Sequence, residues 1–161
     1  MNDNTRSYQL KKSNKQNTAD KVVENRDKST KLIWEKPDSW ISSEGSSMRL
    51  ASFSIPYSGG IGDLSVIQLG GDGGGLKSNV NRWRGQLNLG PIGLLDIEKD
   101  IVKEEGQLNI YSTIQIINQE IDSAFFCAII PSGNYTIFVK LSLKPMGIIE
   151  IKDDFIKFCS S

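Results

Sequence analysis

The feature of this sequence that most constrains its fold is a glycine cluster between an apolar run and a helical pattern. Five of the six residues from 70 to 75 are glycine, and they follow the apolar run Leu64–Leu69. Glycine adopts backbone angles closed to other residues, and a run of it costs conformational entropy unless a tight turn requires it. Apolar residues then recur at the spacing of an amphipathic helix. The segment therefore predicts a strand, a tight corner and a helix with the stripe Leu76, Val80, Trp83 and Leu87.

The same order of strand, glycine loop and helix start is found in phosphate-binding sites. A P-loop requires the pattern G-x-x-x-x-G-K-[ST]. Counting from Gly71 puts Leu76 at the second glycine, and counting from Gly70 inserts Leu76 before Lys77. Neither register fits, so the sequence does not predict a P-loop. Two interpretations stay open: a structural connection, and a loop over Gly71–Ser78 that binds a small anion or phosphate ligand, either as a binding protein or as an enzyme.

Composition narrows the function classes. The 161 residues include 19 basic and 19 acidic side chains and no histidine. Balanced charge gives no general attraction to nucleic acid, which we do not expect as a partner. The absence of histidine removes the commonest general base and metal ligand, and it excludes Ser-His-Asp and Cys-His arrangements. We therefore predict a protein that is not an enzyme, without catalytic residues, metal or cofactor. Cys127 and Cys159 lie in apolar stretches, which predicts buried thiols rather than a disulfide.

The beginning of the chain has a different composition. Residues 1–30 are polar and rich in basic side chains, which predicts a disordered lead before a single domain over 31–161. A basic tether for an acidic partner is the alternative. This lead lacks the apolar core of a signal peptide, which favours a cytoplasmic location. No run of the chain is long and apolar enough to predict a transmembrane helix.

The first half of the domain predicts a hairpin and two helices. Met48–Ile55 carries apolar residues on both faces and predicts a central strand, joined by a turn to the strand Leu64–Leu69. On such a strand Arg49 needs a carboxylate or carbonyl partner, and a ligand contact is the alternative. After the helix that starts at Leu76, a shorter helix is predicted over Leu94–Lys103.

The second half predicts three antiparallel strands, over 108–117, 123–130 and 135–143. A last helix follows, because Ile148, Ile151, Phe155 and Phe158 form one apolar stripe. The expected fold class is α+β, an antiparallel β-sheet with helices packed on it.

Five segments carry a resemblance to a known family: Met48-Arg-Leu-Ala-Ser-Phe53, Leu64-Ser-Val66 with the glycine run, Asn79-Val-Asn-Arg-Trp-Arg-Gly-Gln86, Tyr135-Thr-Ile-Phe-Val-Lys-Leu141 and Phe155-Ile-Lys-Phe-Cys-Ser-Ser161. The most specific part is the Asn-x-Asn-Arg-Trp-x-Gly-Gln block, and the resemblance covers residues 34–161. The segments resemble a family of uncharacterised bacterial proteins, common in planctomycetes and other marine bacteria and often described as lipoproteins.

This resemblance implies a PsbP-like α/β/α sandwich, the layout of a photosystem II extrinsic subunit and of a Ran-binding nuclear import factor. Those relatives are non-enzymatic accessory or binding proteins. The lipoproteins among the relatives imply export and membrane association. Here the chain departs from the family, because no lipoprotein signal or lipobox cysteine precedes the polar lead.

Together these observations predict a non-catalytic binding or accessory module with a protein partner. Arginine and tryptophan dominate interface energies, and arginine matches carboxylates and phosphates in two-point geometry. The alternative is that Trp83 belongs to the core and that the arginines bond within the fold. The candidate contact residues are Asn79, Asn81, Arg82, Trp83, Arg84 and Gln86 beside the glycine loop, with Lys77 and Arg49.

Overall fold

The computed structural model describes residues 34–43, 48–107 and 109–161. The predicted lead over residues 1–30 lies outside these ranges, and the fold belongs to the unit Trp34–Ser161. Within the described residues, seven antiparallel strands form one sheet in the order β3-β4-β5-β9-β8-β7-β6. The strands are β3 (Ile41–Ser42), β4 (Ala51–Tyr57), β5 (Gly60–Gly70), β6 (Val102–Glu105), β7 (Ile110–Asn118), β8 (Ser123–Ser132) and β9 (Tyr135–Leu143); the helices are α1 (Leu76–Gln86), α2 (Leu94–Asp100), the short 3-10 helix η2 (Gln119–Ile121) and α3 (Gly147–Ser160).

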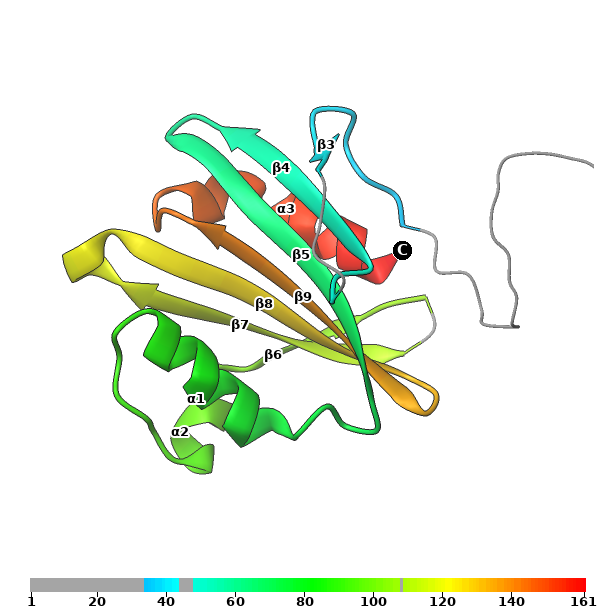
Figure 1. Cartoon of the computed structure of the whole chain (residues 1–161), viewed down its shortest axis with the longest axis vertical. Coiled ribbons are helices and arrows are strands. Elements are labelled where there is room, and N and C mark those ends of the chain that lie inside the picture. The colour runs from blue at the N-terminus through cyan, green and yellow to red at the C-terminus, as the bar shows by residue number, and fades with distance from the viewer. Residues whose placement is uncertain (1–33, 44–47, 108) are drawn as a thin grey trace, which may run out of the picture. The chain divides into compact units, whose positions relative to one another are not determined.

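Helices lie on both faces of the sheet, so the predicted α+β class is confirmed. Figure 1 shows α1 and α2 in front of the sheet and α3 behind it. The hairpin of β4 and β5 and the meander of β7, β8 and β9 are antiparallel, as the sequence predicted. The two groups join through β5 and β9, which pair from Asp63↔Ser142 to Gly70↔Tyr135.

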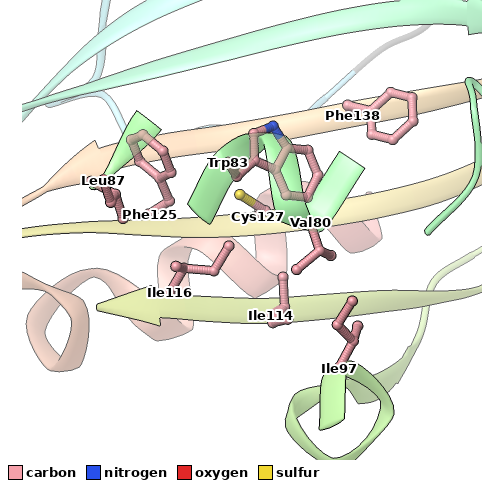
Figure 2. Packing of buried hydrophobic residues seen from close by; sticks show 9 residues of the cluster. All are labelled: Val80, Trp83, Leu87, Ile97, Ile114, Ile116, Phe125, Cys127 and Phe138. Carbon is pink, nitrogen blue, oxygen red and sulfur yellow. The ribbon is translucent and has the colours of Figure 1, made fainter. Parts of the chain in front are cut away.

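The face under α1 and α2 is apolar over β7, β8 and part of β9. Figure 2 shows Val80, Trp83 and Leu87 of α1 on these strands, with Ile97 of α2 beside them. Trp83 is 2% exposed, and its ring meets Phe138 edge-on at 6.1 Å. Large apolar groups removed from water supply the main stabilisation of such a layer. The cluster also contains Ile114, Ile116, Phe125 and Cys127.

The opposite face holds an aromatic core under α3. Phe155 of α3 stacks on Phe126 of β8 at 4.2 Å, and Phe158 lies 5.3 Å from the buried ring of Trp40. Trp34 also stacks on Phe158, at 5.5 Å. The two tryptophans near the start of the domain therefore anchor this core. Cys127 and Cys159 are both buried and free, as predicted.

The predicted helix over Leu94–Lys103 is wrong in its second part. Helix α2 ends at Asp100, Ile101 is extended, and Val102 begins strand β6, which pairs with β7. β-Branched Ile101 and Val102 favour extended backbone, and the ladder to β7 decides between the two structures. Strand β6 forms one border of the sheet with four residues, and β3 forms the other with two.

The glycine cluster forms the corner between β5 and α1. Gly71, Gly73, Gly74 and Gly75 all have positive φ, the backbone region that glycine occupies without strain. A Cβ atom built on Gly73 would lie 2.4 Å from the ring of Phe138, so this position also needs the absence of a side chain. The Thr136 hydroxyl donates to the Gly71 carbonyl at 2.7 Å and ties the corner to β9.

Candidate functional site

The predicted contact residues of α1 divide between the two sides of the helix. Trp83 lies in the core, so its indole supplies packing and is not presented on the surface. The guanidinium of Arg82 lies 5.8 Å from the centre of that ring and is itself exposed to solvent. A cation near an aromatic ring gains a modest electrostatic attraction. Of this adjacent pair, Arg82 is therefore the residue that a partner can reach.

Three further residues of the motif hold the fold together. Asn79 is buried and donates to the carbonyls of Gly73 and Gly75 at 3.0 and 2.7 Å, which fixes the glycine corner. Asn81 exchanges two hydrogen bonds with the backbone of Ile92, at 3.0 and 2.9 Å. Arg84 donates from Nε to the Gly90 carbonyl at 2.7 Å. Asn81 and Arg84 thus bind the loop between α1 and α2 to α1, whereas Asn79 binds the glycine corner.

Arg82 and Gln86 lie one helical turn apart, on the side of α1 that borders β9. Gln86 accepts a hydrogen bond from Lys140 Nζ at 2.9 Å, and Arg82 donates from Nη1 to Asn79 Oδ1 at 2.7 Å. Lys140 Nζ also lies 4.7 Å from the centre of the Phe125 ring. These contacts place two cations where α1 meets the sheet.

On the sheet face that carries α1, the side chains from Lys140 of β9 across β5 to β4 are polar. The pairing of these three strands places them in two rows that run across the sheet. Figure 1 shows no helix in front of β4 and β5. We call this surface the polar face; its rows are Ser52, Ser65 and Lys140, and Ser54, Asp63 and Ser142.

Arg49 is a third cation at the polar face, in addition to Lys140 within it and Arg82 beside it. It lies before β4 rather than within the strand, which corrects its predicted place on a buried strand. Its guanidinium pairs with Asp63 at 3.2 Å and donates to the Ser52 hydroxyl at 3.1 Å. The sequence predicted a carboxylate or carbonyl partner for Arg49, and Asp63 is that partner. The side chain of Arg49 is 30% exposed and that of Asp63 is 56% exposed, so solvent reaches this pair.

The polar face is electrostatically unfavourable for Lys140. Burial lowers the pKa of its ammonium group, and the positive charges of Arg82 and Arg49 lower it further, while Cys127 and Asp63 act in the opposite direction. A cation held partly out of water beside two others costs stability.

We expect Lys140→Met to melt at or above the wild-type temperature at neutral pH, because methionine keeps the apolar contact and removes a partly buried charge. The folded-state pKa of Lys140 lies below its unfolded value of about 10.4. Between these values the unfolded chain binds more protons, so wild-type stability rises with pH there and the advantage of methionine shrinks. Thermal melts over a pH series measure this. Lys140→Arg, which stays charged, is the control, and a methionine variant less stable at neutral pH would contradict the expectation.

The glycine corner borders two hollows. A pocket of about 420 Å³ lies between the corner and the β8–β9 hairpin, with Leu76, Ile129 and Phe138 in its lining and Asp72 among its polar residues. A second hollow of about 600 Å³ includes Lys77, at the exposed start of α1. Helix α1 starts at Leu76, and its N-cap residue Gly75 provides no side-chain cap. Anion binding at Gly71–Ser78 stays a prediction, and Lys77 lies apart from the polar face.

Comparison with solved structures identifies the architecture. A solution structure of cyanobacterial PsbP (CyanoP) from Synechocystis sp. PCC 6803 superposes with a TM-score of 0.50 at 15% identity, covering 80% of this chain and 83% of that one. The fold is PsbP-like.

A crystal structure from Bacteroides thetaiotaomicron superposes on 80% of this chain with a TM-score of 0.51 at 12% identity. This chain spans 42% of that protein's length. No protein-family model and no curated protein matches the sequence. The PsbP-like fold expected from the resemblance is therefore confirmed. The bacterial family with its Asn-x-Asn-Arg-Trp-x-Gly-Gln motif stays a prediction.

Over the described ranges of the chain, no three histidine, cysteine, aspartate or glutamate side chains come close enough together to hold a metal ion. Among the described helices, none combines the length and apolar character needed to cross a lipid bilayer.

Sequence reasoning missed Lys140 and the serines of the polar face. The signal was present, because Lys140 is the one charged residue between Tyr135 and Leu143, in a strand otherwise made mostly of apolar residues. A lone cation in such a strand has to reach water or a partner. Its neighbours could not be identified from the sequence, because the pairing of β9 with β5 joins segments far apart in the chain.

Proposed function

We propose that this domain is a non-catalytic binding module, and that it contacts a protein partner through the polar face together with Arg82 and Gln86. One observation carries the proposal: three cations, Arg49, Arg82 and Lys140, lie close together at the polar face. This part of the sheet is not covered by the apolar layer under α1 and α2. Side chains that only stabilise a fold are seldom placed where they repel one another.

The surface also has the chemistry of a recognition site. Arginine is enriched at the energetic centres of interfaces, and its planar guanidinium presents several donors to one acceptor group. Ser52 and Ser65 of this face are buried, so a partner would meet it at the half-buried Ser54, Lys140 and Ser142 and at the exposed Asp63. The non-enzymatic role implied by the resemblance to PsbP-like proteins agrees with this kind of function.

We expect Arg82→Glu to reduce capture of the partner at least about tenfold, because like-charge contacts at an interface cost several kcal/mol. The tagged full chain would be cross-linked in cells of its source, and the recovered proteins quantified by mass spectrometry. Lys77→Glu makes the same change of charge on α1 outside the polar face, and its capture should equal that of the wild type. Melting temperatures of both variants show whether the fold is kept.

Equal capture by wild type and Arg82→Glu, with both proteins folded, would disprove the proposed surface. Equal losses in the two glutamate variants would show a general effect of charge, and they too would contradict it.

A further inference from the structure

The N–H donors of Arg82 and Lys140 are only partly used for hydrogen bonds within the fold. A guanidinium has five N–H donors and an ammonium has three. Arg82 uses Nη1 toward Asn79, and Lys140 uses one donor toward Gln86. Arg82 is exposed and Lys140 is half-buried, so further donors of both groups can reach a molecule placed on the polar face.

The spacing of these groups is fixed by the fold. Lys140 is held by the ladder of β9 with β5 and β8, and by its bond to Gln86. Arg82 is held by its bond to Asn79, which is itself bonded to the glycine corner. Charged donors fixed before a ligand arrives lose less conformational entropy on binding. The two cations are therefore held in place before an acidic ligand arrives.

Asp63 and Arg49 indicate which acceptor suits this surface. Arg49 already holds the carboxylate of Asp63 with both Nη atoms, at 3.2 and 3.5 Å, so a carboxylate fits among these side chains. Arg49, Arg82 and Lys140 outnumber the single negative charge of Asp63, so this surface attracts a negatively charged ligand. The pair of Arg49 and Asp63 shows a carboxylate held by a guanidinium at this place, and an acidic side chain of a partner presents the same group.

From these contacts we infer that Arg82 and Lys140 bind a carboxylate presented by an acidic peptide segment of the partner. This inference rests on the proposed function, and it names the chemical class of the ligand. The segment lies on β9 and β5 beside α1, where the half-buried Ser142 supplies a hydroxyl group next to Asp63. Binding is charge-assisted and weakens as salt is added.

The test titrates the full chain with a fluorescein-labelled peptide of alternating glutamate and glycine, followed by fluorescence anisotropy. A peptide with glutamine in place of glutamate is the matched control, and inorganic phosphate and vesicles of anionic lipid are separate arms. We expect Arg82→Gln and Lys140→Gln each to weaken binding about tenfold, as expected for the loss of one charge-assisted contact of about 1.4 kcal/mol. Lys77→Gln, which removes the same charge elsewhere on α1, should bind as the wild type does.

A readout on the wild-type protein covers the case in which a variant fails to fold. In amide NMR spectra, the glutamate peptide should shift the signals of Ser65 and Ser142 and leave those of Lys77 and Ser78 unchanged. Several results would overturn the inference: no binding of the glutamate peptide, equal binding of the glutamine peptide, an equal loss in Lys77→Gln, or tighter binding of phosphate or vesicles than of the peptide.

Failure of this inference is distinguishable from failure of the proposed function. If Arg82→Glu loses its partner in cells but the wild type does not bind the glutamate peptide, only the ligand class is wrong. If the peptide binds as expected but capture in cells does not depend on Arg82, the proposed function is wrong.

Discussion

Replacing Trp83 with alanine should lower the free energy of unfolding by about 3–5 kcal/mol, the range measured for large aromatic side chains removed from a core. Trp83 is 2% exposed and lies between α1 and the apolar strands of the sheet, as Figure 2 shows. Its loss leaves a cavity under the helix that carries Arg82 and Gln86. A loss of this size is a large part of the roughly 5–15 kcal/mol that stabilises a typical domain.

Denaturant unfolding of the purified variant measures this effect, with circular dichroism as the probe because the substitution removes one of three tryptophans. Trp83→Phe is the control, since it keeps an aromatic ring in the cluster and should lose much less. A loss below about 0.5 kcal/mol for alanine, the range of surface substitutions, would show that α1 does not pack on the sheet through this residue.

Replacing Gly73 with alanine should have the second-largest effect, a loss of about 2–5 kcal/mol in the free energy of unfolding. Two causes add: the positive φ of 66° costs about 1–2 kcal/mol for a residue with a side chain, and a methyl group forced against Phe138 costs about 1–3 kcal/mol. The corner has to shift to accommodate the new atom, and the start of α1 moves with it.

Gly71→Ala separates these two causes. Gly71 has a φ of 58°, but a Cβ atom added to it would meet no other atom within 4 Å, so only the cost of the backbone conformation applies. In denaturant unfolding, the free energy of unfolding of Gly73→Ala should therefore be lower than that of Gly71→Ala by about 1–3 kcal/mol. Equal losses would mean that the ring of Phe138 moves aside without cost.

The sequence was most informative where one periodicity extends over a whole element. The stripe from Leu76 to Leu87 predicted α1 within one residue, and the strand predicted over 135–143 coincides with β9. It was least informative after α2. The end of this helix and the short strand β6 have the same mixed composition of apolar and charged residues, so no change of pattern marks the boundary. There the ladder between β6 and β7 decides the structure, and no local pattern contains that information.

The candidate site was predictable only in part, for the same reason. The Asn-x-Asn-Arg-Trp-x-Gly-Gln block drew attention to α1, but the sequence could not show which side chains turn inward. Asn81 and Arg84 bind the loop before α2, whereas Arg82 faces solvent beside Lys140. That division depends on where α1 lies on the sheet. The tertiary packing that places it is absent from the helical pattern itself.

The short border strands of the sheet limit how this domain can associate with other chains. A border strand with free backbone groups can recruit another strand, and short charged borders discourage this. Strand β3 offers two residues and β6 offers four, with Lys103, Glu104 and Glu105 among them. In the part of the chain that the structure describes, β3 and β6 themselves offer a visiting chain only a few main-chain hydrogen bonds. On the proposed binding surface, selectivity for a partner then rests on side-chain chemistry, which point substitutions can retune without rebuilding the backbone.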